Sequence, residues 1–244
     1  MTSELIPLWR RLAAEFLGSA FLAGLVIGSG IAAQRLSPGQ TGLELAENAA
    51  ATAAGLFAII LMFGPVSGGH FNPVVSFADA AFGGLSWRDA AAYLPAQVAG
   101  CTAGAVLANL MFALPAVSIS AKDRATGAHF LSEVIATLGL LLVIFALARS
   151  GRGSSAPAAV GAYIGAAYWF TSSTSFANPA ITIGRMFSGT FAGIAPGSVL
   201  SFTGAQVIGG ALAVAIVKVL YPAITPADAA SIIVPRDSGP ARSH

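Results

Sequence analysis

Long apolar segments alternate with short polar breaks along this chain. Six segments are long enough for a helix that crosses a bilayer, which needs about 20 residues. They lie at residues 12–33, 48–66, 90–112, 129–148, 156–173 and 198–220. The breaks contain residues that favour turns, as in Ser37-Pro38-Gly39 and Gly83-Gly84. The pattern predicts an all-α membrane protein with six transmembrane helices.

Two shorter apolar segments interrupt this series, and each directly follows an Asn-Pro pair. Residues 73–82 follow Asn72, and residues 179–188 follow Asn178. Each segment has about ten residues, half the length of a spanning helix. Proline suits the first position of a helix because its missing N–H would be unbonded there, and asparagine suits the cap before it. We predict two half-helices that begin inside the membrane. The apolar flanks disfavour the alternative of two ordinary loop turns.

The two halves of the chain also repeat one another. Glu15 stands near the start of the first span and Glu133 near the start of the fourth, and Ala-Gln-Val-Ala-Gly at 96–100 matches Ala-Gln-Val-Ile-Gly at 205–209. Each repeat contains three spans, an odd number, so the repeats must cross the membrane in opposite directions. Inverted repeats with broken helices place a shared site at their interface, near the middle of the bilayer.

These features predict one domain and one tail. The domain covers residues 1–222, with repeats at about 10–112 and about 128–220. Residues 223–244 are rich in Pro, Asp and Arg and are expected to form a polar cytoplasmic tail.

Composition agrees with a membrane protein. Apolar residues make up 56% of the chain and charged residues 9%, against about 25% charged in soluble domains. A net charge of +2 rests on few charges and does not imply a nucleic-acid partner. The single cysteine, Cys101, excludes an intrachain disulfide and is expected to be a small packing residue.

The basic residues predict the orientation of the chain. With both termini in the cytoplasm, eight basic residues lie inside and four outside, in agreement with the positive-inside tendency. The inner set is Arg10, Arg11, Arg88, Arg149, Arg152, Lys218, Arg236 and Arg242, and the outer set is Arg35, Lys122, Arg124 and Arg185.

The two Asn-Pro motifs, the paired Glu residues and the run Ser-Gly-Gly-His-Phe-Asn-Pro together resemble the aquaporin and aquaglyceroporin family over roughly residues 10 to 220. The resemblance implies an aquaporin-like inverted repeat of six tilted helices and two re-entrant half-helices that meet at the centre. It also implies a homotetramer with one pore per subunit.

The resemblance assigns roles to three groups of residues. The Asn-Pro motifs at the pore centre are Asn72, Pro73, Val74, Asn178, Pro179 and Ala180. Backbone carbonyls turned into the pore are expected at Gly68, Gly69, His70, Phe71, Thr174, Ser175, Phe176 and Ala177. Glu15 and Glu133 are expected to accept N–H groups of the pore loops, with Gln97 and Gln206 bracing the same loops. Two alternatives remain open, a proton relay through the two Glu residues and gating by His70.

The selectivity filter departs from the common pattern of the family. Counting without gaps along the corresponding elements gives Thr52, Ala166, Ser175 and Ile181, with Ile181 at the usual Arg position. None of these residues is large or aromatic, which predicts a wide constriction and resembles the bacterial branch associated with arsenic resistance. Arg185 is a further candidate: it either reaches the outer vestibule or is anchored to the external surface or to a neighbouring carboxylate.

The function implied is a passive channel for small neutral solutes, namely glycerol, urea, arsenite-type trihydroxides and water. The alternatives are a water-selective aquaporin and an ion-coupled secondary transporter. We expect no enzymatic activity, because passage of a neutral solute makes and breaks no bond, and no cofactor. A metalloid efflux enzyme is disfavoured because the chain lacks GxxxxGK[ST]. We expect no metal site, because His70, His129 and His244 show no ligand spacing. The expected partners are these solutes, membrane lipid and further copies of the chain in a homotetramer. The expected location is a bacterial inner membrane.

Overall fold

The computed structural model describes residues 6–221, so the predicted tail at 223–244 lies outside the described residues. Within this range the chain forms helices and loops, and no strand is present. The helices of the first half are α1 (Leu8–Leu36), α2 (Thr41–Ser67), α3 (Pro73–Phe82) and α4 (Trp87–Met111). Those of the second half are α5 (Gly127–Arg149), η1 (Gly153–Ser155), α6 (Ala156–Phe170), α7 (Pro179–Gly184), η2 (Arg185–Phe187) and α8 (Pro196–Leu220). The prediction of an all-α fold is confirmed.

Five helices are long and apolar enough to cross a membrane, namely α1, α2, α4, α5 and α8. The fifth predicted span, 156–173, is shorter than expected, because α6 has 15 residues and ends at Phe170. A single turn, η1, precedes it. The second half-helix is also shorter, because α7 has 6 residues and continues as the tighter turn η2.

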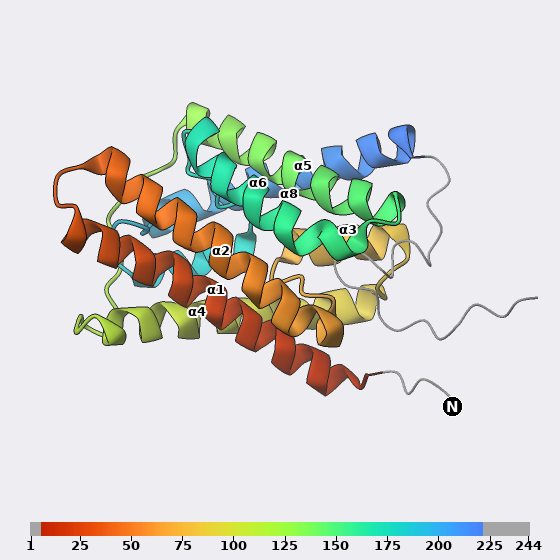
Figure 1. Ribbon diagram of the computed structural model, residues 1–244, viewed down its shortest axis with the longest axis horizontal. Helices are drawn as coiled ribbons and strands as arrows, with labels where there is room; N and C mark the ends of the chain where they lie inside the picture. Colours follow the sequence, from red (N-terminus) through yellow and green to blue (C-terminus); the bar gives the residue numbers. More distant parts are fainter. Residues whose placement is uncertain (1–5, 222–244) are drawn as a thin grey trace, which may run out of the picture.

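The helices lie along the long axis of the molecule, as Figure 1 shows. In the first repeat α1 packs between α4 and α2, and in the second repeat α5 packs against α8 and α6. The repeats meet where α2 contacts α6, and the half-helices α3 and α7 contact α8 and α4 of the opposite repeat. The first turn of α1 and the last turn of α8 lie at the same end of the molecule, on the right in Figure 1.

Matching glycines bring the helices of each repeat close together. A Cβ atom at Gly100 would overlap the carbonyl oxygen of Phe16, and one at Gly209 would overlap that of Val134. These glycines end the repeated Ala-Gln-Val sequences, and Phe16 and Val134 directly follow the paired Glu residues. Small residues therefore allow α4 and α8 to approach α1 and α5 closely enough for side chains to bond across the helix pair.

Large apolar side chains remain exposed on the outer faces of the helices. Examples are Phe21, Leu61, Leu107, Trp169 and Leu200, each 50% to 84% exposed. An apolar exterior around a buried polar interior is the arrangement expected of a protein whose solvent is lipid.

Candidate functional site

The two half-helices begin at asparagines that are both caps and links between the repeats. Asn72 Oδ1 accepts the N–H of Val74 at 3.0 Å, and Asn178 Oδ1 accepts that of Ala180 at 2.9 Å. Pro73 and Pro179 occupy the first helical positions, which explains why the chain turns into a helix there.

The side-chain amides of the same asparagines cross the interface. Asn72 Nδ2 donates to the carbonyl of Ala177 at 2.8 Å, and Asn178 Nδ2 donates to the carbonyl of Phe71 at 2.7 Å. Each amide has a second N–H, because the Nδ2 group carries two hydrogens. The positive ends of both half-helices and the two remaining N–H groups therefore meet at the centre of the molecule.

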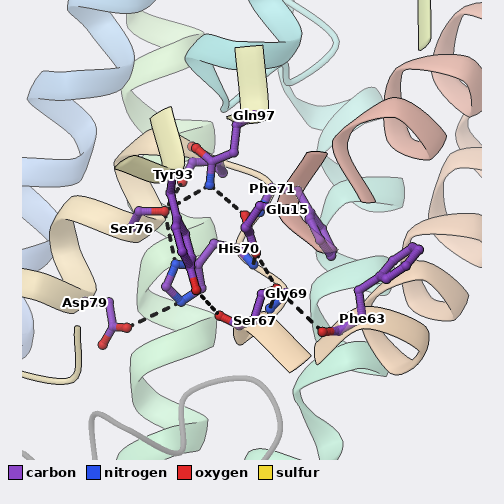
Figure 2. Close-up of polar contacts among 11 residues, drawn as sticks. Glu15, Phe63, Ser67, Gly69, His70, Phe71, Ser76, Asp79, Tyr93 and Gln97 are labelled. Carbon is purple, nitrogen blue, oxygen red and sulfur yellow. Dashed lines mark hydrogen bonds and ion pairs between the residues drawn. The ribbon is translucent and has the colours of Figure 1, made fainter. Parts of the chain in front are cut away.

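Glu15 holds the first pore loop. Its Oε1 accepts the hydroxyl of Ser67 at 2.6 Å and the N–H of His70 at 3.0 Å. Its Oε2 accepts the N–H of Phe71 and the amide of Gln97, both at 2.7 Å. Figure 2 shows this carboxylate between the loop and Gln97 of α4. Glu15 is 0% exposed, and its four donors satisfy a charge that would otherwise be costly in the membrane.

Glu133 holds the second pore loop in the same way. It accepts the hydroxyl of Ser173 at 2.6 Å and the N–H groups of Phe176 and Ala177, each at 2.8 Å. The amide of Gln206 donates to it at 2.7 Å. The structure thus contains, in both repeats, the contacts that the sequence led us to expect of the Glu and Gln residues.

The two loops adopt a backbone that L residues rarely favour. Phe71 and Ala177, each directly before a capping asparagine, both have φ of 48°. This left-handed conformation turns their carbonyls toward the opposite asparagine, at a cost of about 1–3 kcal/mol per residue. Because the Glu carboxylates bond the N–H groups of these same residues, they offset the strain where it arises.

A cavity of about 60 Å³ runs between the loops and the surrounding helices. One wall is aliphatic and comes from α1, α2, α5 and α6, with Leu22, Leu56, Ile60, Ile144 and Val160 among its residues. The facing wall is polar. It consists of loop residues from Gly69 to Asn72 and from Ser175 to Asn178. Since one water needs about 10–15 Å³ by this measure, the cavity has room for a short row of waters or one small solute.

Three of the four predicted filter residues line this cavity, namely Thr52, Ser175 and Ile181. Ala166 does not, and that prediction is wrong. Ile164 and Tyr168 of α6 line the cavity. Residues four apart share a helix face, whereas Ala166, two residues from each, lies on the opposite side and is exposed. Tyr168 takes its place, with its hydroxyl 3.2 Å from Thr52 Oγ1.

The four predicted filter residues include no large or aromatic side chain, whereas the cavity wall also contains Tyr168, Phe176 and Arg185, the further candidate from the sequence. Arg185 lines the cavity and is 2% exposed. Its Nε donates to the carbonyl of Ala192, and its guanidinium stacks on the ring of Phe176, 3.3 Å from the ring centroid. Arg185 is thus buried and, within residues 6–221, forms no ion pair with a carboxylate, and with Tyr168 and Phe176 it adds bulk to the cavity wall.

Some of the other predicted pore residues lie beside the cavity rather than in its wall. Gly68 and Thr174 do not line it, so the row of pore carbonyls is shorter than predicted. Val74 and Ala180 contribute backbone N–H groups to the asparagine caps, and the Val74 side chain packs toward Gly210 of α8.

The sequence reasoning missed a third acidic residue beside the pore. Asp79 of α3 is 2% exposed, and its Oδ2 lies 3.4 Å from Nε2 of His70, a residue of the cavity wall whose side chain is 1% exposed. The repeat could have indicated this residue, because Asp79 follows Asn72 by seven residues, just as Arg185 follows Asn178.

The loop between α4 and α5 fastens the segment that follows η2. Lys122 Nζ donates to the carbonyl of Phe191, and Arg124 Nε donates to that of Gly193, both at 2.9 Å. Burial, with the nearby charges of Arg124 and Arg185, lowers the pKa of Lys122 to about 8. Arg124 and Arg185 both lie over the ring of Phe176, which lines the cavity, so two cations gather beside this part of the cavity and disfavour entry of other cations.

Comparison with known proteins agrees with this geometry. Residues 2–175 match the model of the family described as "Major intrinsic protein". The chain belongs to this family. It is 48% identical to "Aquaglyceroporin AqpS" of Rhizobium meliloti (strain 1021) over 217 residues, which cover 88% of this chain and 92% of that protein. It is 34% identical to "Aquaporin NIP1-4" of Oryza sativa subsp. japonica, over 73% of this chain and 66% of that protein.

The solved structures include a close match in fold. The X-ray structure of the aquaglyceroporin from Plasmodium falciparum superposes with a TM-score of 0.71 at 22% identity, covering 89% of this chain and 99% of that one. The predicted resemblance and fold class are confirmed. This major intrinsic protein is a multi-pass membrane protein and a passive channel for small neutral solutes, not an enzyme.

Proposed function

We propose that the channel passes glycerol, urea and undissociated trihydroxides such as arsenite, together with water. The observation that carries this proposal is the two-sided cavity, with an aliphatic wall opposite a row of loop carbonyls and asparagine amides. A small polyol has hydroxyl groups on one side and a carbon backbone on the other. Its hydroxyl groups can therefore bond to the polar wall while its carbon atoms contact the aliphatic wall, and both contacts replace contacts with water. The similarity of the chain to an aquaglyceroporin supports the same class of solute.

The filter in this proposal consists of Thr52, Tyr168, Ser175, Ile181 and Arg185. Arg185 takes the place of the Arg absent at position 181 and donates hydrogen bonds to the solute. The charge of Arg185 and the positive ends of α3 and α7 raise the energy of a cation at the centre of the pore. The few carbonyls of the loops cannot replace the complete hydration shell that an ion loses on entering the pore. A neutral solute meets neither barrier.

A water-selective channel is the second candidate, because Tyr168 and Arg185 add bulk to the cavity wall. The similarity to an aquaglyceroporin supports the wider range of solutes. We further propose that the protein is a homotetramer in a bacterial inner membrane, in keeping with its bacterial relative. We also propose that both termini lie in the cytoplasm, because more basic residues fall on the side of the membrane where the termini are placed than on the other side.

The test is stopped-flow swelling of liposomes that contain the purified protein, with water, glycerol, urea and arsenite compared in parallel. We expect all four to enter well above the rate of empty liposomes. Entry of water alone would leave the water-selective candidate standing and overturn the proposed solute range.

A further inference from the structure

An apolar groove of about 400 Å³ lies between α3 and α8, apart from the pore. Its lining residues are aliphatic, aromatic or glycine, and it shares none of them with the pore cavity. They include Val74, Phe77 and Ala78 of α3 and Gly210, Ala211 and Val214 of α8. Residues three or four apart share a face of a helix, so each helix contributes one face to this α3–α8 groove.

The equivalent helix pair of the second repeat, α7 and α4, packs directly. A Cβ atom at Gly184 of α7 would lie 2.8 Å from Cβ of Cys101 of α4, so the two helices are in contact there. Counted from the asparagines and the bracing glutamines, the corresponding residues of the first pair are Ala78 and Gly210. Both of these line the groove. The repeats therefore differ at this place, because α3 and α8 leave a hollow where α7 and α4 meet.

The side chain of Val74 accounts for this difference. A Cβ atom at Gly210 would lie 2.3 Å from Cγ1 of Val74, so these two residues are in close contact in the groove wall. The equivalent of Val74 in α7 is Ala180, which lacks both γ methyl groups. The larger side chain occupies the space that a closer approach of α3 to α8 would need, and the helices stay apart beyond this contact.

A groove with apolar walls can retain a lipid chain where a flat apolar face does not. Lipid tails are as apolar as leucine side chains, so the hydrophobic effect does not drive one tail onto such a face in preference to another. In a groove an acyl chain meets protein atoms on several sides, and the added van der Waals contacts favour a chain that stays in place. An acyl chain is therefore the occupant that suits this groove.

A lysine and a tryptophan mark the level of the lipid headgroups beside the groove. Lys218 is exposed and follows Val214 by four residues, so it lies one turn beyond the groove on the same face of α8. Trp87 is 61% exposed, and its ring stacks on that of Phe77 with the ring centroids 6.3 Å apart. Tryptophan is enriched at the interface between lipid and water, and basic residues there attract anionic headgroups. A lipid whose chain lies in the groove thus has a cation near its phosphate.

We propose that the α3–α8 groove binds an anionic phospholipid, with one acyl chain between the helices and the phosphate paired with Lys218. The groove and the pore cavity share no lining residue, so this site is separate from the solute path. Binding of the lipid does not depend on which solute the channel passes.

The test is native mass spectrometry of the purified protein in detergent, titrated with phosphatidylglycerol or with phosphatidylcholine that has the same acyl chains. Wild-type protein is expected to bind its first phosphatidylglycerol several-fold more tightly than its first phosphatidylcholine. Lys218→Gln is expected to remove this preference, and Lys218→Arg is expected to keep it. Ala211→Phe fills the groove and is expected to weaken binding of both lipids several-fold. The matched control is Ala99→Phe, the same change at an exposed position of α4, which is expected to bind lipid as the wild type does.

The position of the lipid is measured by photolabelling of wild-type protein with a phosphatidylglycerol that carries a photoactivatable group in its chain. At a low ratio of lipid to protein, the label is expected on the groove residues of α3 and α8. This measurement needs no variant, so it decides the matter if Ala211→Phe fails to fold.

Three results would overturn the proposal. They are a label spread evenly over the exposed helices, Ala211→Phe with wild-type lipid affinity, and Lys218→Gln with the wild-type preference for phosphatidylglycerol. If Ala211→Phe changes the oligomeric state and leaves lipid affinity unchanged, a second copy of the chain covers the groove, and the proposal is again wrong.

Discussion

Glu133→Gln is expected to lower the melting temperature by about 5 °C or more and to reduce solute flux strongly, with no new dependence on pH. Four donors converge on this carboxylate, from Ser173, Phe176, Ala177 and Gln206. A glutamine offers one acceptor oxygen, and its NH₂ group would face two of the donors. Each buried donor left without a partner costs about 1–3 kcal/mol.

The damage should reach the pore directly, because Ala177 holds its left-handed conformation against this carboxylate and presents its carbonyl to Asn72. The matched control is Glu47→Gln, the same change on α2, where the carboxylate accepts one hydrogen bond from Ser37. Thermal unfolding in detergent and flux in liposomes would be measured for both variants. Glu133→Gln with normal stability and flux that has merely lost a response to a proton gradient would contradict the structural role and favour a proton relay.

Thr52→Trp is expected to reduce glycerol and urea flux by about tenfold or more, and water flux by less, because pore diameter sets the size of solute that passes. Thr52 is 1% exposed and lies against Tyr168 where the cavity passes between α2 and α6. An indole at this position would fill much of a cavity of about 60 Å³. Water needs only a narrow row of hydrogen-bonding positions, so part of its passage should survive.

The control for Thr52→Trp is Leu107→Trp, which adds the same side chain at a position on α4 that is 54% exposed. Swelling would be compared for the two variants after their yield and oligomeric state had been matched. Unchanged glycerol flux through correctly assembled Thr52→Trp would show that the cavity beside Thr52 is not the solute path.

The sequence predicted those parts of the molecule that depend on local rules or on the repeat. The Asn-Pro caps follow from the chemistry of helix starts, and the half-helix α3 matches its predicted bounds. The bonding partners of Glu15 and Glu133 could be expected because two copies of one pattern occur in one chain. Gly100 and Gly209 show the same pattern at the helix contacts.

The parts that the sequence did not predict depend on which side of an element faces inward. Helix α6 is apolar on every side, so its sequence has no periodicity that distinguishes the face of Ala166 from that of Tyr168. Arg185 enters the cavity because α7 ends at Gly184 and the chain continues as the tighter turn η2. The sequence had instead predicted one continuous helix over residues 179–188. Asp79 meets His70 only because the loop folds back on α3, and loop paths are not encoded by local pattern.

Asp79 and His70 also bear on the transporter alternative, because a titratable pair inside the membrane is what proton coupling would need. The pair lies within α3 and the loop before it, where Ser76 bonds to the His70 ring and the bracing Gln97 donates to Ser76. A channel and a coupled transporter differ in how flux depends on concentration and on the gradient.

The most direct test of a passive channel is therefore the glycerol flux of wild-type protein in liposomes, as a function of concentration, temperature and an imposed proton gradient. We expect flux that rises in proportion to the glycerol gradient, has a low activation energy and is the same with and without the proton gradient. Flux that saturates at low glycerol concentration, or that runs uphill when a proton gradient is applied, would contradict the channel.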